Sequence, residues 1–203
     1  FIDTLATSID ARDKITAGHS SRVKLYSMLI VDELGCDTKF KELVEKAAIL
    51  HDIGKIGIRD SVLQKEGKLT DDEYKHIQEH VRITHDILEK IHTSDDFKMI
   101  TEIACSHHEK YDGSGYYRHL SGEDIPYGGR ILAVADVFDA ITSRRHYRDK
   151  MPIQNVIDIL LSGKNKHFDG NLVDAFLRIS VDKIIRVFLT ENHNSFKDED
   201  CET

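Results

Sequence analysis

Histidine and aspartate residues in widely separated segments constrain the fold of this chain more than any other feature of its sequence. Imidazole and carboxylate ligands without thiolates suit iron, manganese, zinc or nickel. A metal centre built from such residues can exist only if the fold brings their segments together. Five segments between residues 19 and 136 carry the candidate ligands His19, His51, Asp52, His80, His107, His108 and Asp136.

The hydrophobic pattern predicts helices along the whole chain. With 203 residues, of which 40% are hydrophobic and 32% charged, the chain is expected to form one soluble globular domain. Apolar residues recur at three- and four-residue spacing, there are only two prolines, and no strand pattern is evident. The predicted fold class is all-α, with helices over residues 1–12, 20–34, 40–53, 70–91, 95–106, 130–143, 152–161 and 172–189.

Local signals mark several helix ends. Thr70 and Glu73 have the spacing of a capping box, in which each side chain accepts a hydrogen bond from the other residue's backbone N–H. Ser94 is a predicted N-cap residue. Gly35 is a predicted C-terminal cap of the second helix, because glycine tolerates the left-handed conformation found there.

Two regions are not expected to be helical. Glycine is concentrated in residues 109–129, which are predicted to form a long loop, and loops of this length in a compact domain usually have a function. Residues 191–203 are polar and lack periodicity, so a disordered tail is expected after a domain of residues 1–190. The chain begins at Phe1, so we expect a piece of a longer protein with an upstream region.

Charge and cysteine content narrow the classes of partner. The net charge is -8 with basic residues interleaved among acidic ones, which argues against binding to duplex nucleic acid. A small anionic ligand is compatible, because bound divalent metal ions would reverse the local field. The longest apolar run, within residues 25–31, is too short to cross a membrane. Three distant cysteines indicate a reducing compartment without disulfides.

The most specific local motif runs from Ala47 to Lys55, where a predicted helix ends in His51 and Asp52, followed by Gly54. Adjacent helical residues point about 100° apart, so His51 and Asp52 would approach one centre from different sides. A carboxylate has two oxygens with which to bridge two ions. Taken alone, such a pair is more often a satisfied helix end. The other candidate ligands favour the metal interpretation.

The remaining ligands differ in how strongly the sequence supports them. Asp136 lies in the apolar stretch of residues 131–138, where a carboxylate is costly unless it is paired or bound to metal. His107 and His108 end a predicted helix at the edge of the glycine-rich loop.

One helix offers three histidines for a single role. His80 has His76 and His85 as competitors, and spacing alone does not choose among them. Cys105 lies two residues before His107, but a buried free cysteine is the favoured interpretation.

The order of these motifs resembles the HD superfamily of metal-dependent phosphohydrolases. More narrowly, the chain resembles the HD-GYP domain, a bacterial class that hydrolyses the second messenger cyclic di-GMP. The resemblance implies an HD-domain helical bundle with a long glycine-rich loop beside the metal site, and it extends over nearly the whole chain. The matching segments lie within residues 12–20, 51–55, 107–109, 112–116, 125–126, 130–136 and 142–148.

The resemblance implies a centre of two divalent metal ions, with iron as the expected metal and manganese as the alternative. Two ions roughly 3.5–4 Å apart would share a hydroxide that attacks the phosphate in line. Asp52, as the bridge, and Lys55, beside the phosphate or the departing oxygen, are the implied catalytic residues. The first ion would be held by His19, His51, Asp52 and Asp136, and the second by Asp52, His80, His107 and His108.

The resemblance also implies which residues bind the substrate. Asp139, Arg145 and Arg148 would meet the guanine base and the distal phosphate. Arg145 and Arg148 also fit ordinary solvated charges at a helix end, and the sequence leaves this alternative open. The implied substrate-binding set is Lys55, Tyr116, Asp139, Arg145 and Arg148.

Two positions depart from the family pattern. Tyr117 stands where the GYP triplet has proline, which could loosen the loop without removing a ligand. Ile15 stands where some members have a glutamate that supports a third metal ion, so a two-metal centre is expected. In the family the dinuclear form tends to stop at the linear dinucleotide pGpG, which is therefore the expected main product.

Three functional hypotheses follow. The leading one is a cyclic di-GMP phosphodiesterase of the bacterial cytoplasm, with an upstream sensory or regulatory domain and a homodimer as a candidate assembly. The second is a phosphohydrolase acting on another nucleotide, such as a different cyclic dinucleotide. The third is a non-catalytic binding or interaction module, which Tyr117 favours and the full ligand set with Lys55 opposes.

Overall fold

The structure is a computed structural model that describes residues 4, 9–10, 18–91, 94–142 and 153–195. Within these ranges the regular structure is helical, and an isolated bridge between Lys164 and Phe168 is the only β-type pairing, so the all-α prediction is confirmed. The elements are α2 (His19–Glu33), α3 (Thr38–Leu50), η1 (Ile53–Gly57), α4 (Asp60–Leu63), α5 (Asp71–Ile91), α6 (Asp95–Ala104), η2 (Gly122–Asp124), α7 (Tyr127–Thr142), α8 (Ile153–Ser162), α9 (Gly170–Arg178) and α10 (Val181–Ser195).

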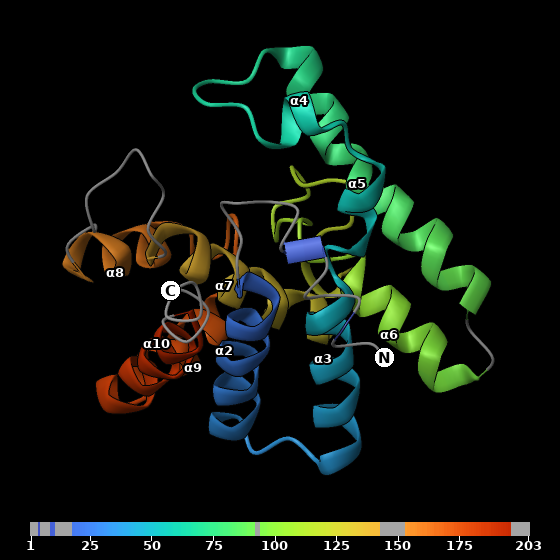
Figure 1. Ribbon diagram of the computed structural model, residues 1–203. Helices are drawn as coiled ribbons and strands as arrows, with labels where there is room; N and C mark the ends of the chain where they lie inside the picture. Colours follow the sequence, from blue (N-terminus) through green and yellow to red (C-terminus); the bar gives the residue numbers. More distant parts are fainter. Residues whose placement is uncertain (1–3, 5–8, 11–17, 92–93, 143–152, 196–203) are drawn as a thin grey trace, which may run out of the picture.

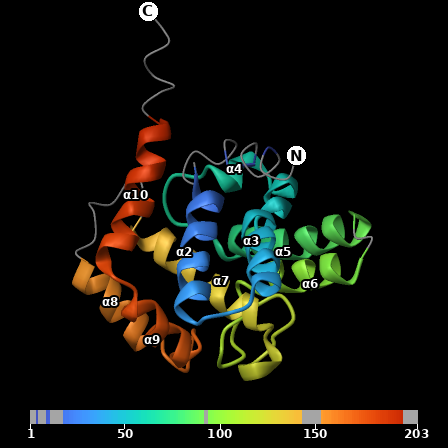
Figure 2. The same cartoon turned by 90° about the horizontal axis from the view of Figure 1, so that it is seen from below.

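The helices are arranged around α2, α3 and α7. Figures 1 and 2 show α2 and α3 side by side in the middle of the molecule, with α7 packed against both. In both views α5 and α6 lie on one side of this centre, and α8, α9 and α10 lie on the other. Segments from both ends of the chain therefore meet at α7.

The sequence of α7 explains its central position. Its side chains are apolar on nearly every face, and Ile131, Leu132 and Val134 are buried. A helix that is hydrophobic all round must be buried all round. Phe138 packs edge-on against Tyr26 of α2, with ring centroids 4.9 Å apart, and against Phe176 of α9 at 4.7 Å.

The predicted helix ends are confirmed where a specific capping signal was present. Thr70 Oγ1 accepts from the backbone N–H of Glu73 at 3.3 Å, and Glu73 Oε2 accepts from that of Thr70 at 2.7 Å. Ser94 Oγ accepts from the backbone N–H of Phe97 at 3.3 Å. Gly35, with φ of 66°, follows the C-cap of α2.

The predicted helix over residues 172–189 is wrong as a single element. The chain becomes extended at Ile179, with φ of -63° and ψ of 132°, and this divides the segment into α9 and α10. α10 continues to Ser195, so the first residues of the tail predicted to be disordered are helical. Residues 196–203 lie outside the described part of the chain.

The predicted helix over residues 40–53 ends earlier than expected. α3 stops at Leu50, and the turn at His51 and Asp52 leads into the short 3-10 helix η1. The two residues of the most specific motif therefore lie at the junction of two helices. This junction can direct neighbouring side chains toward one point in a way that a continuous helix cannot.

Close contact between η1 and α5 depends on Gly54. A Cβ atom at this position would lie 1.9 Å from the backbone oxygen of His80 and 2.5 Å from the backbone nitrogen of Thr84. The backbone N–H of Gly54 donates to Thr84 Oγ1 at 2.9 Å, and this hydroxyl donates to the backbone oxygen of His51 at 3.1 Å. The turn that carries His51 and Asp52 is therefore attached to the helix that carries His80.

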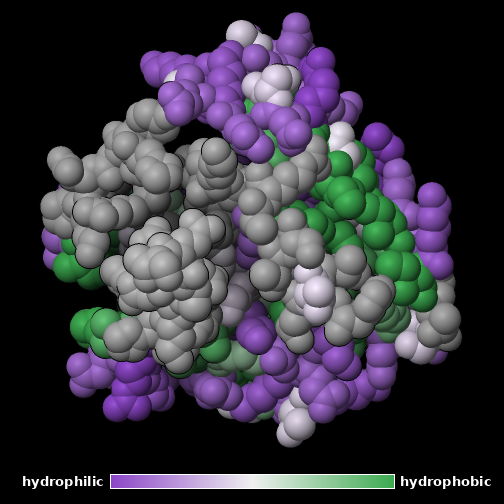
Figure 3. Space-filling view, in the orientation of Figure 1, coloured by the Kyte–Doolittle hydropathy of each residue, from purple (hydrophilic) through white to green (hydrophobic). Residues whose placement is uncertain are grey.

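Where Figure 3 colours this face of the molecule, the surface is mostly hydrophilic, with hydrophobic areas over the side of α5 and over α8. The exposed large apolar side chains include Ile56 of η1, Ile91 of α5 and Leu161 of α8. Among the described residues, no helix combines the length and the hydrophobicity that crossing a bilayer requires.

Candidate metal centre

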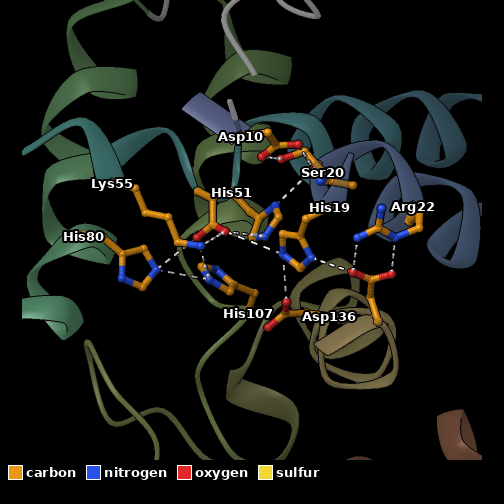
Figure 4. Close-up of polar contacts among 12 residues, drawn as sticks. Asp10, His19, Ser20, Arg22, His51, Lys55, His80, His107 and Asp136 are labelled. Carbon is orange, nitrogen blue, oxygen red and sulfur yellow. Dashed lines mark hydrogen bonds and ion pairs between the residues drawn. The ribbon is translucent and has the colours of Figure 1, made fainter. Parts of the chain in front are cut away.

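The seven predicted ligands meet at one place. Figure 4 shows His19, His51, His80, His107 and Asp136 pointing toward one another from separate elements. Three overlapping groups can be distinguished, and within each the candidate ligand atoms lie within 4.8 Å of one another; one of them, His51 with Asp52 and His107, joins the other two. We call the group His19, His51 and Asp136 site 1, and the group His80, His107 and His108 site 2.

Asp52 lies between the two sites and presents one carboxylate oxygen to each. Its Oδ2 lies 3.3 Å from Nε2 of His51 and 3.6 Å from Nε2 of His19, both in site 1. Its Oδ1 lies 3.3 Å from Nε2 of His80 and 4.0 Å from Nε2 of His107, both in site 2. This arrangement is the one that a bridging carboxylate requires.

The structure also distinguishes His80 from the other two histidines of α5. His80 and Thr84, four residues apart on one face of the helix, are both buried, and this face points toward the turn at Asp52. His76 instead pairs with Glu79, with Nδ1 2.8 Å from the carboxylate. His85 is partly exposed and lies beside acidic side chains of its own helix.

Three of the imidazole rings are oriented by backbone carbonyl groups of their own helix or turn. Each ring places Nδ1 2.7 Å from a carbonyl oxygen three residues earlier, and a carbonyl can only accept. Nδ1 therefore carries the proton and donates, which leaves Nε2 with a free lone pair directed at the centre. These pairs are His51 with Ala48, His80 with Ile77 and His107 with Ala104.

This donor set fits a metal ion. His51 Nε2 is fully buried and has no hydrogen-bond partner among the described residues. A buried acceptor without a partner is costly, and a metal ion would remove that cost. Imidazole nitrogens and carboxylate oxygens together suit first-row transition metals.

Burial keeps the imidazoles of site 2 neutral. It lowers the pKa of His80, lowers the pKa of His107 well below its ordinary value, and lowers the pKa of His108 to about 3. Neighbouring histidines contribute in the same direction. Metal ions bind neutral imidazole, so these rings are in the protonation state that coordination needs.

Site 1 has the opposite electrostatic character. Burial would lower the pKa of His19, but hydrogen bonds with Asp136 and Asp139 raise it to about 10. His19 Nε2 lies 3.2 Å from Asp136 Oδ1. Burial would raise the pKa of Asp136, but its hydrogen bond with His19 keeps that pKa below its ordinary value. Surroundings that favour a proton on His19 also favour a metal cation at the same place.

Lys55 lies at the edge of the centre. Its Nζ is 2.8 Å from Asp52 Oδ2, and its side chain is 15% exposed. Burial alone would raise the pKa of Asp52, but the charge of Lys55 and the neighbouring histidines lower it well below its ordinary value. Asp52 is therefore ionised and able to bind cations.

The loop that follows site 2 is held by one buried acid. Glu109 is 3% exposed and accepts from the backbone N–H groups of Arg118, at 2.6 Å, and Leu120, at 3.1 Å. Within this loop Tyr116 lies beside His108, with ring centroids 4.7 Å apart and planes inclined by 30°. Tyr116 therefore lines the side of site 2.

Asp139 is close to the centre but not open to a ligand. It is 1% exposed, and its carboxylate accepts from His19 and Arg22. These partners argue against direct contact with a nucleotide. Arg145 and Arg148, predicted to bind substrate, lie outside the described residues, as does Ile15.

Arg22 and Thr84 support this centre but are not among the residues predicted from the sequence. A usable signal existed for Arg22, which follows His19 by three residues and so lies on the same face of α2. Asp139 follows Asp136 at the same spacing on α7. No comparable signal marks Thr84, because its role depends on the close approach of η1.

Comparison with known proteins identifies a family. The family model described as HD domain matches residues 3–172. The 3'3'-cGAMP-specific phosphodiesterase 2 of Vibrio cholerae is 39% identical over 173 residues, covering 85% of this chain and 33% of that protein. A probable cyclic di-GMP phosphodiesterase of Vibrio cholerae is 39% identical over 186 residues, covering 85% of this chain and 42% of that protein.

A third relative is the cyclic di-GMP phosphodiesterase response regulator RpfG of Xanthomonas campestris, which is 41% identical over 178 residues, covering 87% of this chain and 47% of that protein. The chain thus spans between a third and a half of the length of these relatives.

A solved structure supports the same assignment at the level of fold. The crystal structure of a cyclic GMP-AMP specific phosphodiesterase of Vibrio cholerae aligns with a TM-score of 0.66 and 18% identity, covering 92% of this chain and 52% of that chain. The family that the motifs predict is confirmed. From its family-model match and its relatives, the chain belongs to the HD domain family.

Proposed function

We propose that this chain is the catalytic domain of a metal-dependent cyclic di-GMP phosphodiesterase that yields mainly linear pGpG. The observation that carries the proposal is the position of Asp52, with one oxygen toward site 1 and the other toward site 2. A pair of ions is the cation arrangement that such a carboxylate fits. Relatives at 39–41% identity are named cyclic di-GMP phosphodiesterases.

We assign the first ion to site 1 with Asp52 and the second to site 2 with Asp52. Two divalent ions, iron or manganese, would supply a hydroxide nucleophile at neutral pH and positive charge for the phosphate oxygens. The predicted lack of a third ion rests on Ile15 alone. The pGpG product is proposed on the same ground.

The chain's own side chains would bind and orient the phosphodiester. The ammonium group of Lys55 lies next to Asp52 and is only partly buried, so a phosphate at the centre would come within its reach. There it would offset charge on the phosphate or on the departing oxygen. The ring of Tyr116 beside His108 offers a flat surface for part of the nucleotide.

A second candidate substrate is another cyclic dinucleotide. A relative named as specific for 3'3'-cGAMP is 39% identical, the same value as a relative named for cyclic di-GMP. Sequence identity therefore does not separate the two substrates. Location in the bacterial cytoplasm, an upstream domain, a homodimer and substrate contacts by Arg145 and Arg148 stay predictions.

The test is hydrolysis by protein purified anaerobically and loaded with ferrous iron or manganese. Cyclic di-GMP and 3'3'-cGAMP are supplied separately at equal concentration, and products are followed by chromatography. We expect cyclic di-GMP to be consumed with accumulation of pGpG, and Lys55→Ala to reduce the rate. Asp86→Asn, on the exposed side of α5, is the matched control and is expected to leave the rate unchanged.

Three results would contradict the proposal at different points. Faster turnover of 3'3'-cGAMP would select the second substrate. Prompt conversion to GMP would contradict the prediction based on Ile15. No turnover of either nucleotide, with metal content verified, would leave a non-catalytic binding module.

A further inference from the structure

The four histidines nearest Asp52 are not oriented in the same way. His51, His80 and His107 each donate from Nδ1 to a carbonyl oxygen of their own helix or turn. Their orientation is therefore local, because it follows from the helix in which each one lies. For His19, the first residue of α2, the described partner of Nδ1 is not a carbonyl oxygen of its own helix.

A carboxylate from a distant helix takes this role for His19. Nδ1 of His19 lies 2.8 Å from Oδ2 of Asp139 in α7, 120 residues away. An ionised carboxylate only accepts, so Nδ1 keeps a proton toward Asp139, and Nε2 is the atom that would give up its proton and offer a lone pair to a metal ion at the centre. The Nε2 atom is the one that lies 3.6 Å from Asp52 and 3.2 Å from Asp136.

Asp139 is itself held in place by Arg22. Arg22 Nε donates to Oδ1 at 2.7 Å, and Nη2 donates to Oδ2 at 3.1 Å. The two side chains are 13% and 1% exposed. A two-point contact of this kind fixes the plane of the carboxylate as well as its position. Arg22 lies one turn after His19 on α2 (Figure 4), and both side chains bind Asp139, so α2 supplies both groups.

We propose that Asp139, fixed by Arg22, is a positioning residue that sets the ring orientation and tautomer of His19 and thereby the metal affinity of site 1. The inference rests on the proposed metal-dependent function. This positioning role replaces the direct contact with substrate that the family resemblance implies for Asp139. No carboxylate is described in this role in site 2, where the rings of His80 and His107 donate to backbone carbonyls of their own helix or turn.

Asparagine is the informative substitution at this position. An amide that keeps its oxygen toward Arg22 Nε turns its NH₂ group toward His19, which forces His19 Nδ1 to accept and moves the proton to Nε2. The reversed amide places NH₂ against the Nε donor of Arg22. Either orientation loses a hydrogen bond, although the side chain keeps its shape.

The test measures metal binding and not only turnover. Manganese is titrated into chelator-treated wild-type protein, Asp139→Asn and Arg22→Lys, and binding is followed by electron paramagnetic resonance and calorimetry. We expect Asp139→Asn to weaken one of two sites by about 10- to 100-fold, the range for loss of an outer partner of a metal ligand. The other site should be unchanged, and Arg22→Lys should weaken the same site less.

A second readout reports on the ring itself. In chelator-treated protein labelled with ¹⁵N at histidine, the ring signals of His19 should change on Asp139→Asn, whereas those of His80 and His107 should not. Asp86→Asn provides a matched control, because it makes the same chemical change in an exposed pair with Arg82 at 2.8 Å. If Asp139→Asn does not fold, Arg22→Lys carries the test by the same two measurements.

Several outcomes would overturn the inference. Unchanged manganese affinity with a raised KM for the dinucleotide would make Asp139 a substrate contact. Equal weakening of both sites would make the effect a general loss of structure. Wild-type protein that binds two ions but hydrolyses no nucleotide would refute the proposed function alone, whereas wild-type protein that binds no divalent ion would refute both.

Discussion

Site 1 and site 2 share Asp52 but are built from different chemistry. Site 1 includes the carboxylate Asp136 and has a second carboxylate, Asp139, behind His19. Site 2 consists of three imidazoles. Opposite charge raises the pKa of His19 in site 1, while burial lowers the pKa of His108 in site 2. Site 1 would therefore attract a cation by charge, and site 2 would bind one through neutral nitrogen donors.

This difference shows how one carboxylate can lie between two sites that differ in their number of other carboxylate groups. An ion in site 2 would depend on Asp52 for its negative ligand among the residues described there, whereas an ion in site 1 would also have Asp136. The two sites also reach their geometry differently. Backbone carbonyls orient the rings of His80 and His107, and a long-range ion pair orients His19.

The largest expected effect is that of Asp52→Ala. The substitution removes the carboxylate from both sites at once, so turnover should fall by more than the roughly 100-fold caused by loss of an outer partner alone. Site 2 should lose its ion first because it has no other carboxylate in its group. Metal content by mass spectrometry and initial rates measure the two effects.

Asp136→Ala is the matched comparison for this prediction. It removes a carboxylate from site 1 only, so site 2 should keep its ion. Retention of both ions by Asp52→Ala, with circular dichroism unchanged, would contradict the bridging role.

The next largest effect concerns Gly54, which joins the two sites structurally. A Cβ atom there would meet the backbone oxygen of His80 at 1.9 Å, so Gly54→Ala must push η1 away from α5. We expect a loss of about 3 kcal/mol in the free energy of unfolding, since overpacking of a close contact costs this much. For a chain of this size, that is a fall of about 6–12 °C in Tm.

Gly35→Ala separates crowding from backbone conformation. Gly35 has φ of 66° and no atom within 4 Å of the added Cβ, so only the left-handed conformation opposes the substitution. The expected loss is about 1 kcal/mol. Equal losses for the two alanine variants in calorimetry would show that close packing at Gly54 does not matter.

In metal-free protein the two sites should respond to pH in opposite directions. The pKa of His19 is raised from 6.5 to about 10, so its stabilisation is present below pH 6.5 and lost as the pH rises toward 10. The pKa of His108 is lowered from 6.5 to about 3, so its stabilisation is present above pH 6.5 and lost as the pH falls toward 3.

Urea unfolding of chelator-treated protein at several pH values checks this contrast. The destabilisation caused by His19→Gln should shrink by at least about 1 kcal/mol as the pH rises from 6.5 to 9. The destabilisation caused by His108→Gln should shrink by a similar amount as the pH falls from 6.5 to 5. If the destabilisation caused by the two substitutions changed with pH in the same direction, the proposed electrostatic difference between the sites would be wrong.

The contrast between the sites also separates what the sequence could predict from what it could not. The ligands His51, Asp52 and Asp136 stand in recognisable local motifs, and the capped ends at Thr70 and Ser94 are local as well. The capped ends are confirmed and the three candidate ligands lie in one cluster, and in each case the signal lies within a few neighbouring residues.

Long-range causes were missed. The ion pair that joins Arg22 and Asp139 connects residues 117 positions apart, and local spacing, which places each of them one turn after a candidate ligand, does not show that they meet. The break at Ile179 carries no glycine or proline, so hydrophobic spacing continues through it. The choice of His80 needed the family resemblance, because burial against η1 is decided by tertiary packing.

The smallest expected effect is that of Cys105→Ala, which tests whether site 2 includes a sulfur ligand. This residue lies two positions before His107, yet it is buried, and burial raises the pKa of its thiol to about 12. A thiol with such a pKa stays protonated and does not act as a thiolate ligand. Cys105→Ala should therefore keep both ions and change turnover by no more than about two-fold, as expected for a buried free cysteine. Mass spectrometry of bound metal and initial rates measure this, with His107→Ala as the positive control. Loss of one ion from Cys105→Ala would mean that site 2 includes a sulfur ligand, and its all-imidazole character, on which the contrast with site 1 depends, would be wrong.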